Sequence, residues 1–150
     1  MISKAVRVVA VCTFFGHREV LDDIEIVLES TVEDLIKNKN VTTFYVGNQG
    51  GFDFTVSKVL KKLKLKYPHI ICRIALAYMP QKNVEYNLQT VVFDGAETVL
   101  PKYAIDKRNR WMIKHSQYVV CYVKYTFGGA AKYKKVAEKQ NKTVINIMDI

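Results

Sequence analysis

Short apolar runs of strand length alternate with segments of helical periodicity along this 150-residue chain. The runs are VRVVAVC (6–12), TTFYVG (42–47), HIICRIALAY (69–78), YVVCYV (118–123) and TVINIM (143–148). Continuous apolar runs are typical of strands that are covered on both faces, as in parallel sheets. The alternation therefore predicts an α/β fold of three layers, Rossmann-like, with a five-stranded, mostly parallel sheet between helices.

The segments between these runs carry helix signals. One apolar stripe comprises Val20, Ile24, Val27, Leu28, Leu35 and Ile36, with the acidic residues Glu19, Asp22, Asp23 and Glu25 in its first turns. Further helices are expected from near Phe52 to before Pro68, over 104–115 and over about 130–140. Right-handed crossovers then give the strand order 3-2-1-4-5. TVVFDG (90–95) is either a short strand or an extended segment.

The length predicts a single domain, residues 1–150, and the first apolar run is too short for a signal peptide. No stretch is apolar enough to span a membrane, so we expect a cytoplasmic protein. Cys12, Cys72 and Cys121 are interpreted as buried free thiols of a reducing compartment. The three histidines are scattered, and no metal site is expected.

The net charge of +9 suggests an anionic partner. Much of the excess lies in KVLKKLKLKY (58–67) and KYKKVAEKQNK (132–142), where lysines alternate with apolar residues at helical spacing. We interpret these lysines as the solvated faces of two helices. Nucleic acid is therefore a possible partner but not the favoured one.

Three glycine-rich turns follow predicted strands: TFFGHR (13–18), GNQGG (47–51) and KYTFGG (124–129). In open parallel sheets, ligands bind beyond the carboxyl ends of the strands where the winding reverses. That point falls between the first strand and the strand at 118–123, so the three turns should converge on one site. Glycine lets a phosphate approach main-chain N–H groups, and the helix after each turn presents a positive dipole end.

Arg18 adds a planar cation that can grip a phosphate in two places, and His17 can donate a hydrogen bond. Arg108 and Asn109, in a helix that leads into the strand at 118–123, are either solvated or reach back over the strand ends; Arg110 is expected to be solvated. The alternative that each glycine turn serves tight packing only stays open. G-x-G-x-x-G, the P-loop pattern and G-x-S-x-G are all absent.

Taken together, TFFGHR, YVGNQGGFD, RNRWMIKHSQYVVCYV and FGGAAKYKKVAEKQNKTVINI resemble the SLOG superfamily, which includes the Lonely Guy cytokinin-activating enzymes and the DNA-processing protein A of bacterial transformation. The resemblance covers about Val6 to Ile147 and is strongest to small SLOG proteins of Firmicutes. It implies a domain that binds a nucleotide or an ADP-ribose-like ligand. The expected ligand-binding residues are Gly16, His17, Arg18, Gly47, Asn48, Gly50, Gly51, Arg108, Asn109, Thr126, Gly128 and Gly129.

The fourth turn departs from the phosphoribohydrolase pattern P-G-G-x-G-T-x-x-E. Here it reads FGGAAKYKK, without the proline, threonine and glutamate, and Ala130 stands where small relatives often have threonine. The favoured function is therefore nucleotide binding or sensing, with no cofactor beyond that ligand. A possible homodimer is expected on exposed Trp111 or Tyr103 surfaces.

Two alternatives remain from the sequence. The first is an enzyme acting on a nucleotide N-glycosidic bond, which needs a carboxylate to stabilise the sugar cation; the candidates are Asp53, Glu85, Asp94 and Glu97. Asp53 is interpreted in the first place as a cap of the second helix. The second alternative is a DNA-binding module, suggested by the charge.

Overall fold

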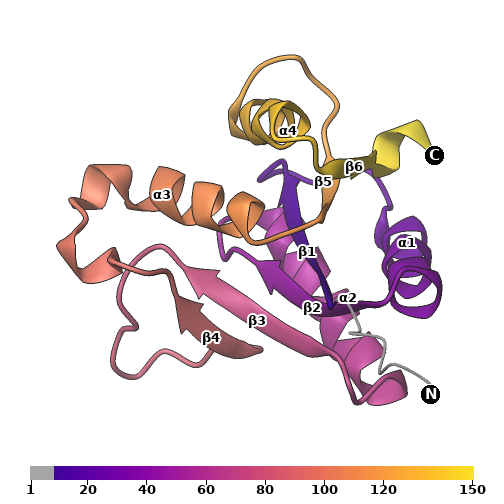
Figure 1. Cartoon of the computed structure of the whole chain (residues 1–150), viewed down its shortest axis with the longest axis horizontal. Coiled ribbons are helices and arrows are strands. Elements are labelled where there is room, and N and C mark those ends of the chain that lie inside the picture. The colour runs from indigo at the N-terminus through magenta and orange to yellow at the C-terminus, as the bar shows by residue number, and fades with distance from the viewer. Residues whose placement is uncertain (1–8) are drawn as a thin grey trace, which may run out of the picture.

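The computed structural model describes residues 9–150 (Figure 1). Its strands are β1 (Ala10–Gly16), β2 (Val41–Val46), β3 (Ile71–Leu76), β4 (Gln89–Val92), β5 (Tyr118–Tyr122) and β6 (Thr143–Asn146). They form one parallel sheet of 6 strands in the order β4-β3-β2-β1-β5-β6. The predicted parallel α/β fold is confirmed, and the predicted order is extended by one strand.

The additional strand, β4, begins one residue before the segment 90–95, which the sequence left open between a strand and an extended stretch. It pairs with β3 from Arg73 opposite Gln89 to Leu76 opposite Val92. All four of its residues are exposed or half-buried because it is the edge of the sheet. This partial exposure removes the apolar run by which the central strands are recognised.

Two pairs of helices cover the two faces of the sheet (Figure 1). The helices are α1 (Glu25–Asn38), α2 (Gly51–Lys66), α3 (Pro101–Lys114) and α4 (Gly129–Lys139), with short 3-10 turns η1 (Ala96–Thr98) and η2 (Ile147–Asp149). α1 and α2 bury their apolar residues with Cys12, Phe14 and Phe44 of the sheet. α3 and α4 pack on the other face, around Phe15 and Cys121.

The first strand lies further along the chain than predicted. Residues 6–8 of the expected strand 6–12 lie outside the described residues, and β1 continues through Gly16, into the stretch expected to be a loop. Thr13 is fully buried in the sheet and donates a hydrogen bond from Oγ1 to the Tyr45 carbonyl at 2.8 Å. That bond satisfies a polar group within an otherwise apolar strand.

Helix α1 begins at Glu25, later than its acidic residues suggested. Asp22 does not lie in the first turn. Its Oδ2 accepts a hydrogen bond from the Tyr122 hydroxyl at 2.5 Å and forms an ion pair with Lys124 at 2.9 Å. These contacts hold the 17–24 segment against the end of β5, so the chain enters the helix only after it.

The three cysteines are buried and free, as predicted. None of the helices in the described part of the chain has both the length and the apolar character needed to cross a membrane. Trp111 is not the exposed surface residue expected for a dimer, because its ring packs against Tyr45 and His115 with centroids 5.1 and 4.8 Å away. Tyr103 is half exposed.

Candidate functional site

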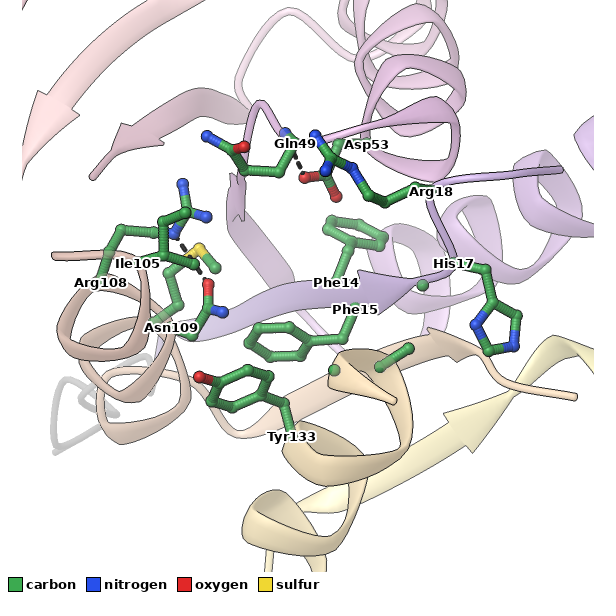
Figure 2. Close-up of a pocket in the computed structure, with 14 residues that line it drawn as sticks. Phe14, Phe15, His17, Arg18, Gln49, Asp53, Ile105, Arg108, Asn109 and Tyr133 are labelled. Carbon is green, nitrogen blue, oxygen red and sulfur yellow. Dashed lines mark hydrogen bonds between the residues drawn. The ribbon is translucent and has the colours of Figure 1, made fainter. Parts of the chain in front are cut away.

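A cavity of about 420 Å³ opens at the carboxyl edge of the sheet, where β1 lies between β2 and β5 and the winding reverses. Figure 2 shows the side chains that converge on it from β1, from the turn after β2, from α3 and from α4. The lining residues are Phe14, Phe15, Gly16, His17, Arg18, Gln49, Asp53, Ile105, Arg108, Asn109, Met112, Gly129, Ala130 and Tyr133.

The first two glycine turns are joined to each other. Gly51 donates its N–H to the Arg18 carbonyl at 2.7 Å, and Phe52 donates its N–H to the His17 carbonyl at 3.3 Å. A Cβ at Gly51 would lie 2.7 Å from the Arg18 carbonyl oxygen. The first two N–H groups of α2 are therefore occupied by protein, and these glycines serve close packing between the two turns.

Gly47 is required for a different reason: two charged side chains occupy the space that a side chain at this position would need. A Cβ at this position would lie 2.8 Å from Asp53 Oδ2 and 3.2 Å from Arg108 Cζ. The carboxylate and the guanidinium therefore lie near the same point without a direct ion pair between them (Figure 2). Both line the cavity.

The interpretation of Asp53 as a cap of α2 is wrong, because its carboxylate does not bond to the N–H groups of that helix. Its Oδ2 accepts a hydrogen bond at 2.9 Å from the N–H of Gln49, which precedes the helix, so it braces the turn instead. Burial raises the pKa of Asp53 to about 6, although the Gln49 N–H and the Arg108 charge act in the opposite direction. A carboxyl group with this pKa exchanges protons near neutral pH, as a general acid or base must.

Arg108 is only 2% exposed although it carries a guanidinium. Its Nε donates to Asn109 Oδ1 and one terminal nitrogen donates to the Ala75 carbonyl, both at 2.8 Å. Burial lowers the pKa of Arg108, and the nearby Asp53 carboxylate raises it. These bonds fix the guanidinium plane beside the cavity, where it can present its remaining N–H groups to an anion or a hydroxyl.

Tyr133 closes the cavity from α4. Its hydroxyl donates to Asp106 Oδ1 at 2.6 Å, and its ring stacks on Phe15 with centroids 5.3 Å apart. Burial and the Asp106 carboxylate raise the pKa of Tyr133 to about 12, so it stays neutral. The cavity wall is thus aromatic at this side, and its charged groups come from Asp53, Arg108 and Arg18.

The amino end of α4 borders the same cavity through Gly129 and Ala130. Within the described residues no side chain caps this helix, and its first intrahelical bond joins the Lys132 N–H to the Gly128 carbonyl. A Cβ at Gly129 would meet nothing within 4 Å. Here, unlike at the first two turns, packing does not require glycine, and the helix end that carries unpaired N–H groups borders the cavity.

Two residues form the rim. Arg18 is exposed, and none of the described carboxylates forms an ion pair with it. His17 accepts a hydrogen bond at Nε2 from the Lys124 N–H at 2.8 Å, which leaves the ring proton on Nδ1. Burial and the charge of Lys124 lower the pKa of His17, so the imidazole is neutral at pH 7.

The expected ligand-binding residues separate into groups. The main cavity is lined by Gly16, His17, Arg18, Arg108, Asn109 and Gly129. Gly47, Asn48 and Gly50 line a neighbouring cavity of about 270 Å³, which also contains Asp53. Thr126 and Gly128 line a groove on the other side of the α4 turn, and Gly51 lines none of these three spaces.

Sequence reasoning missed Gln49 and Tyr133, which also line the main cavity. Gln49 lies between the glycines of a predicted turn, and Tyr133 lies in a lysine-rich helix, so neither carried a signal of its own. Among the other carboxylate candidates, Glu85 lines the smaller cavity. Asp94 and Glu97 line neither space and are exposed at the turn before η1 and within it.

Among residues 9–150, no three His, Cys, Asp or Glu side chains gather in a way that would hold a metal ion. The fold and the cavity define a parallel α/β protein with a cavity at the winding reversal of its sheet. No family model matches the chain, and none of the curated proteins compared with it matches either.

Proposed function

We propose that the chain binds a nucleotide or a nucleotide-derived ligand of the ADP-ribose type in the main cavity, as a SLOG-type protein of the cytoplasm. The observation that carries this proposal is the end of α4: packing does not require glycine at Gly129, and this helix amino end borders the cavity that Arg18 also lines. A phosphate accepts hydrogen bonds from such N–H groups, and ribose hydroxyls bond to Asp53 and Asn109.

Calorimetry and thermal shift with AMP, NAD, ADP-ribose and cyclic nucleotides test this proposal. We expect saturable heat and a raised Tm with at least one of them. Gly129→Val should abolish that binding, because its side chain adds bulk at the helix end where we propose that the phosphate binds, while its Cβ meets no protein atom within 4 Å. Arg18→Ala should weaken it about tenfold, whereas Lys39→Ala, which removes an exposed cation at the opposite edge of the sheet, should not change it. Absence of heat and of any thermal shift with every nucleotide would refute the proposal.

The second candidate function is cleavage or transfer at a nucleotide N-glycosidic bond. It is favoured by the raised pKa of Asp53, about 6, opposite Arg108 in the same cavity. Such a carboxyl group can protonate the leaving base or stabilise the sugar cation. Chromatography of a nucleotide incubated with wild type, Asp53→Asn and Glu85→Gln should show release of the base, lost only in Asp53→Asn. Intact nucleotide after long incubation with wild type contradicts the enzyme.

A further inference from the structure

The turn between β5 and α4 carries two stacked aromatic rings in solvent. Phe127 is 71% exposed and Tyr125 is 47% exposed. Their ring centroids lie 5.3 Å apart at an interplanar angle of 18°. Tyr125 also packs on His17, with centroids 5.1 Å apart. His17 in turn accepts a hydrogen bond from the Lys124 N–H, so the segment after β1 packs against the pair of rings.

A groove of about 380 Å³ is lined by Phe127 and by residues of α4. Its lining residues are Thr126, Phe127, Gly128, Lys132, Lys135, Val136 and Lys139. The three lysines follow the helix at spacings of three and four residues, so they share one side of it. At 1.5 Å per residue, Lys132 and Lys139 are about 10 Å apart along the axis. None of the described carboxylates lines the groove.

The lysines of this groove differ from those of α2, the other lysine-rich helix, in how far their charge is neutralised by carboxylates. On α2, Lys58, Lys62 and Lys66 pair with glutamates of α1 at 3.2, 3.0 and 2.9 Å. On α4, Lys132 of the groove lies 3.5 Å from the Asp106 carboxylate. Lys135 and Lys139 form no ion pair with any described residue.

We propose that the β5–α4 surface, defined as Tyr125, Phe127, Lys132, Lys135 and Lys139, binds single-stranded nucleic acid. Aromatic rings that stack on bases, beside a row of lysines that follows the phosphates, are how such strands are held without sequence preference. One phosphate cannot contact lysines about 10 Å apart along the helix, so the row fits several nucleotides rather than one. In a duplex the bases stack on one another, so no base face is free to stack on the Phe127 ring.

Fluorescence anisotropy with labelled 12-nucleotide DNA and RNA strands tests the surface. Phe127→Ala should weaken binding at least about fivefold, because stacking on one base is lost. Tyr103→Ala, which removes a half-exposed ring on α3, should leave it unchanged. Lys135→Ala/Lys139→Ala should weaken binding and make log K less steep in log salt by about 1.4. The matched control is Lys37→Ala/Lys61→Ala, which lowers the net charge equally on α1 and α2.

Equal losses in the two lysine pairs, or binding of duplex DNA as tight as that of single strands, would overturn the proposal in favour of general attraction by net charge. Displacement of the strand by excess AMP would also overturn it, because the strand would then occupy the main cavity. The result is independent of the nucleotide proposal: Gly129→Val should leave strand binding intact, and Phe127→Ala should leave nucleotide binding intact.

Discussion

Asp53 is the residue whose chemistry depends most on its surroundings. It lines both the main cavity and its smaller neighbour, and it lies beside Gly47 opposite the buried Arg108. The guanidinium opposes the effect of burial but does not cancel it, and the pKa settles at about 6. At a pH above about 6, Asp53 is ionised in the folded protein, and its burial then lowers the free energy of unfolding.

Asp53→Asn should therefore change stability with pH in a defined direction. The raised pKa favours the folded wild type fully below pH 3.8, and this contribution is lost as the pH rises through about 6. The stability of Asp53→Asn relative to wild type should thus increase between pH 4 and pH 8, by up to about 3 kcal/mol. The asparagine oxygen still accepts the Gln49 N–H. Urea unfolding of both proteins at several pH values measures the difference in their free energies of unfolding. A difference that does not change with pH would contradict the raised pKa.

The glycines also differ residue by residue. A Cβ at Gly16 would lie 2.3 Å from the Phe52 ring, which is fully buried and cannot move aside. Gly16→Ala should therefore cost about 1–3 kcal/mol in unfolding free energy. Gly129→Ala meets open space and should change it by less than about 0.5 kcal/mol. Chemical denaturation of both variants checks this, and similar losses at the two positions would show that the packing assignment is wrong.

At the scale of elements, α1 and α2 are joined by a ladder of three ion pairs at successive turns, Glu25–Lys58, Glu29–Lys62 and Glu33–Lys66. The pairs form because both helices repeat their charges every four residues along facing edges. The lysines of α2 were predicted to form a solvated face, and they are indeed exposed, but the charge of three of them is neutralised by glutamates of α1.

A double-mutant cycle on the middle pair should measure this ladder. Glu29→Gln and Lys62→Gln should show a coupling of about 0.5 kcal/mol, the value typical of exposed pairs. Because the charges are in solvent, 1 M NaCl should remove most of the coupling. Thermal or urea unfolding of the four proteins at low and high salt gives the cycle. A coupling that persists at 1 M NaCl would mean that the side chains interact by packing.

The elements that sequence patterns predicted well are the strands buried on both faces and the helices with one apolar side. β2 and β5 agree with the predicted runs to within a residue or so at each end, and α2, α3 and α4 lie where helical periodicity placed them, α3 beginning three residues earlier. β4 was left open because an edge strand lacks a continuous apolar run. The start of α1 was placed too early because Asp22 is held by Tyr122 and Lys124, residues about a hundred positions away in the chain.

At the scale of the whole molecule, the predicted strand order placed the site where the cavity lies, beside β1 and β5. Arg108 and Asn109 were expected there from the SLOG resemblance, whereas their position in the chain left them either solvated or reaching over the strand ends; both line the cavity. The strand order could not predict that Gly50 and Gly51 pack on Arg18, because that contact joins two turns from different strands. The strand order could thus be predicted from the sequence, whereas the contacts between one turn and another could not.

The order of the strands also predicts which parts of the sheet unfold locally first. β1 is bonded to β2 and β5, and its residues from Cys12 to Phe15 are buried on both faces, whereas β4 is bonded to β3 alone and is partly exposed throughout. Amide hydrogen exchange should therefore be slowest in β1, β2 and β5, at the free energy of global unfolding, and faster by orders of magnitude in β4 and in residues 79–88. A nucleotide in the main cavity should slow exchange in the 17–24 segment and the first turn of α4 more than in β4. Protection of β4 equal to that of β1 would mean that the edge strand belongs to the same cooperative unit as the centre of the sheet.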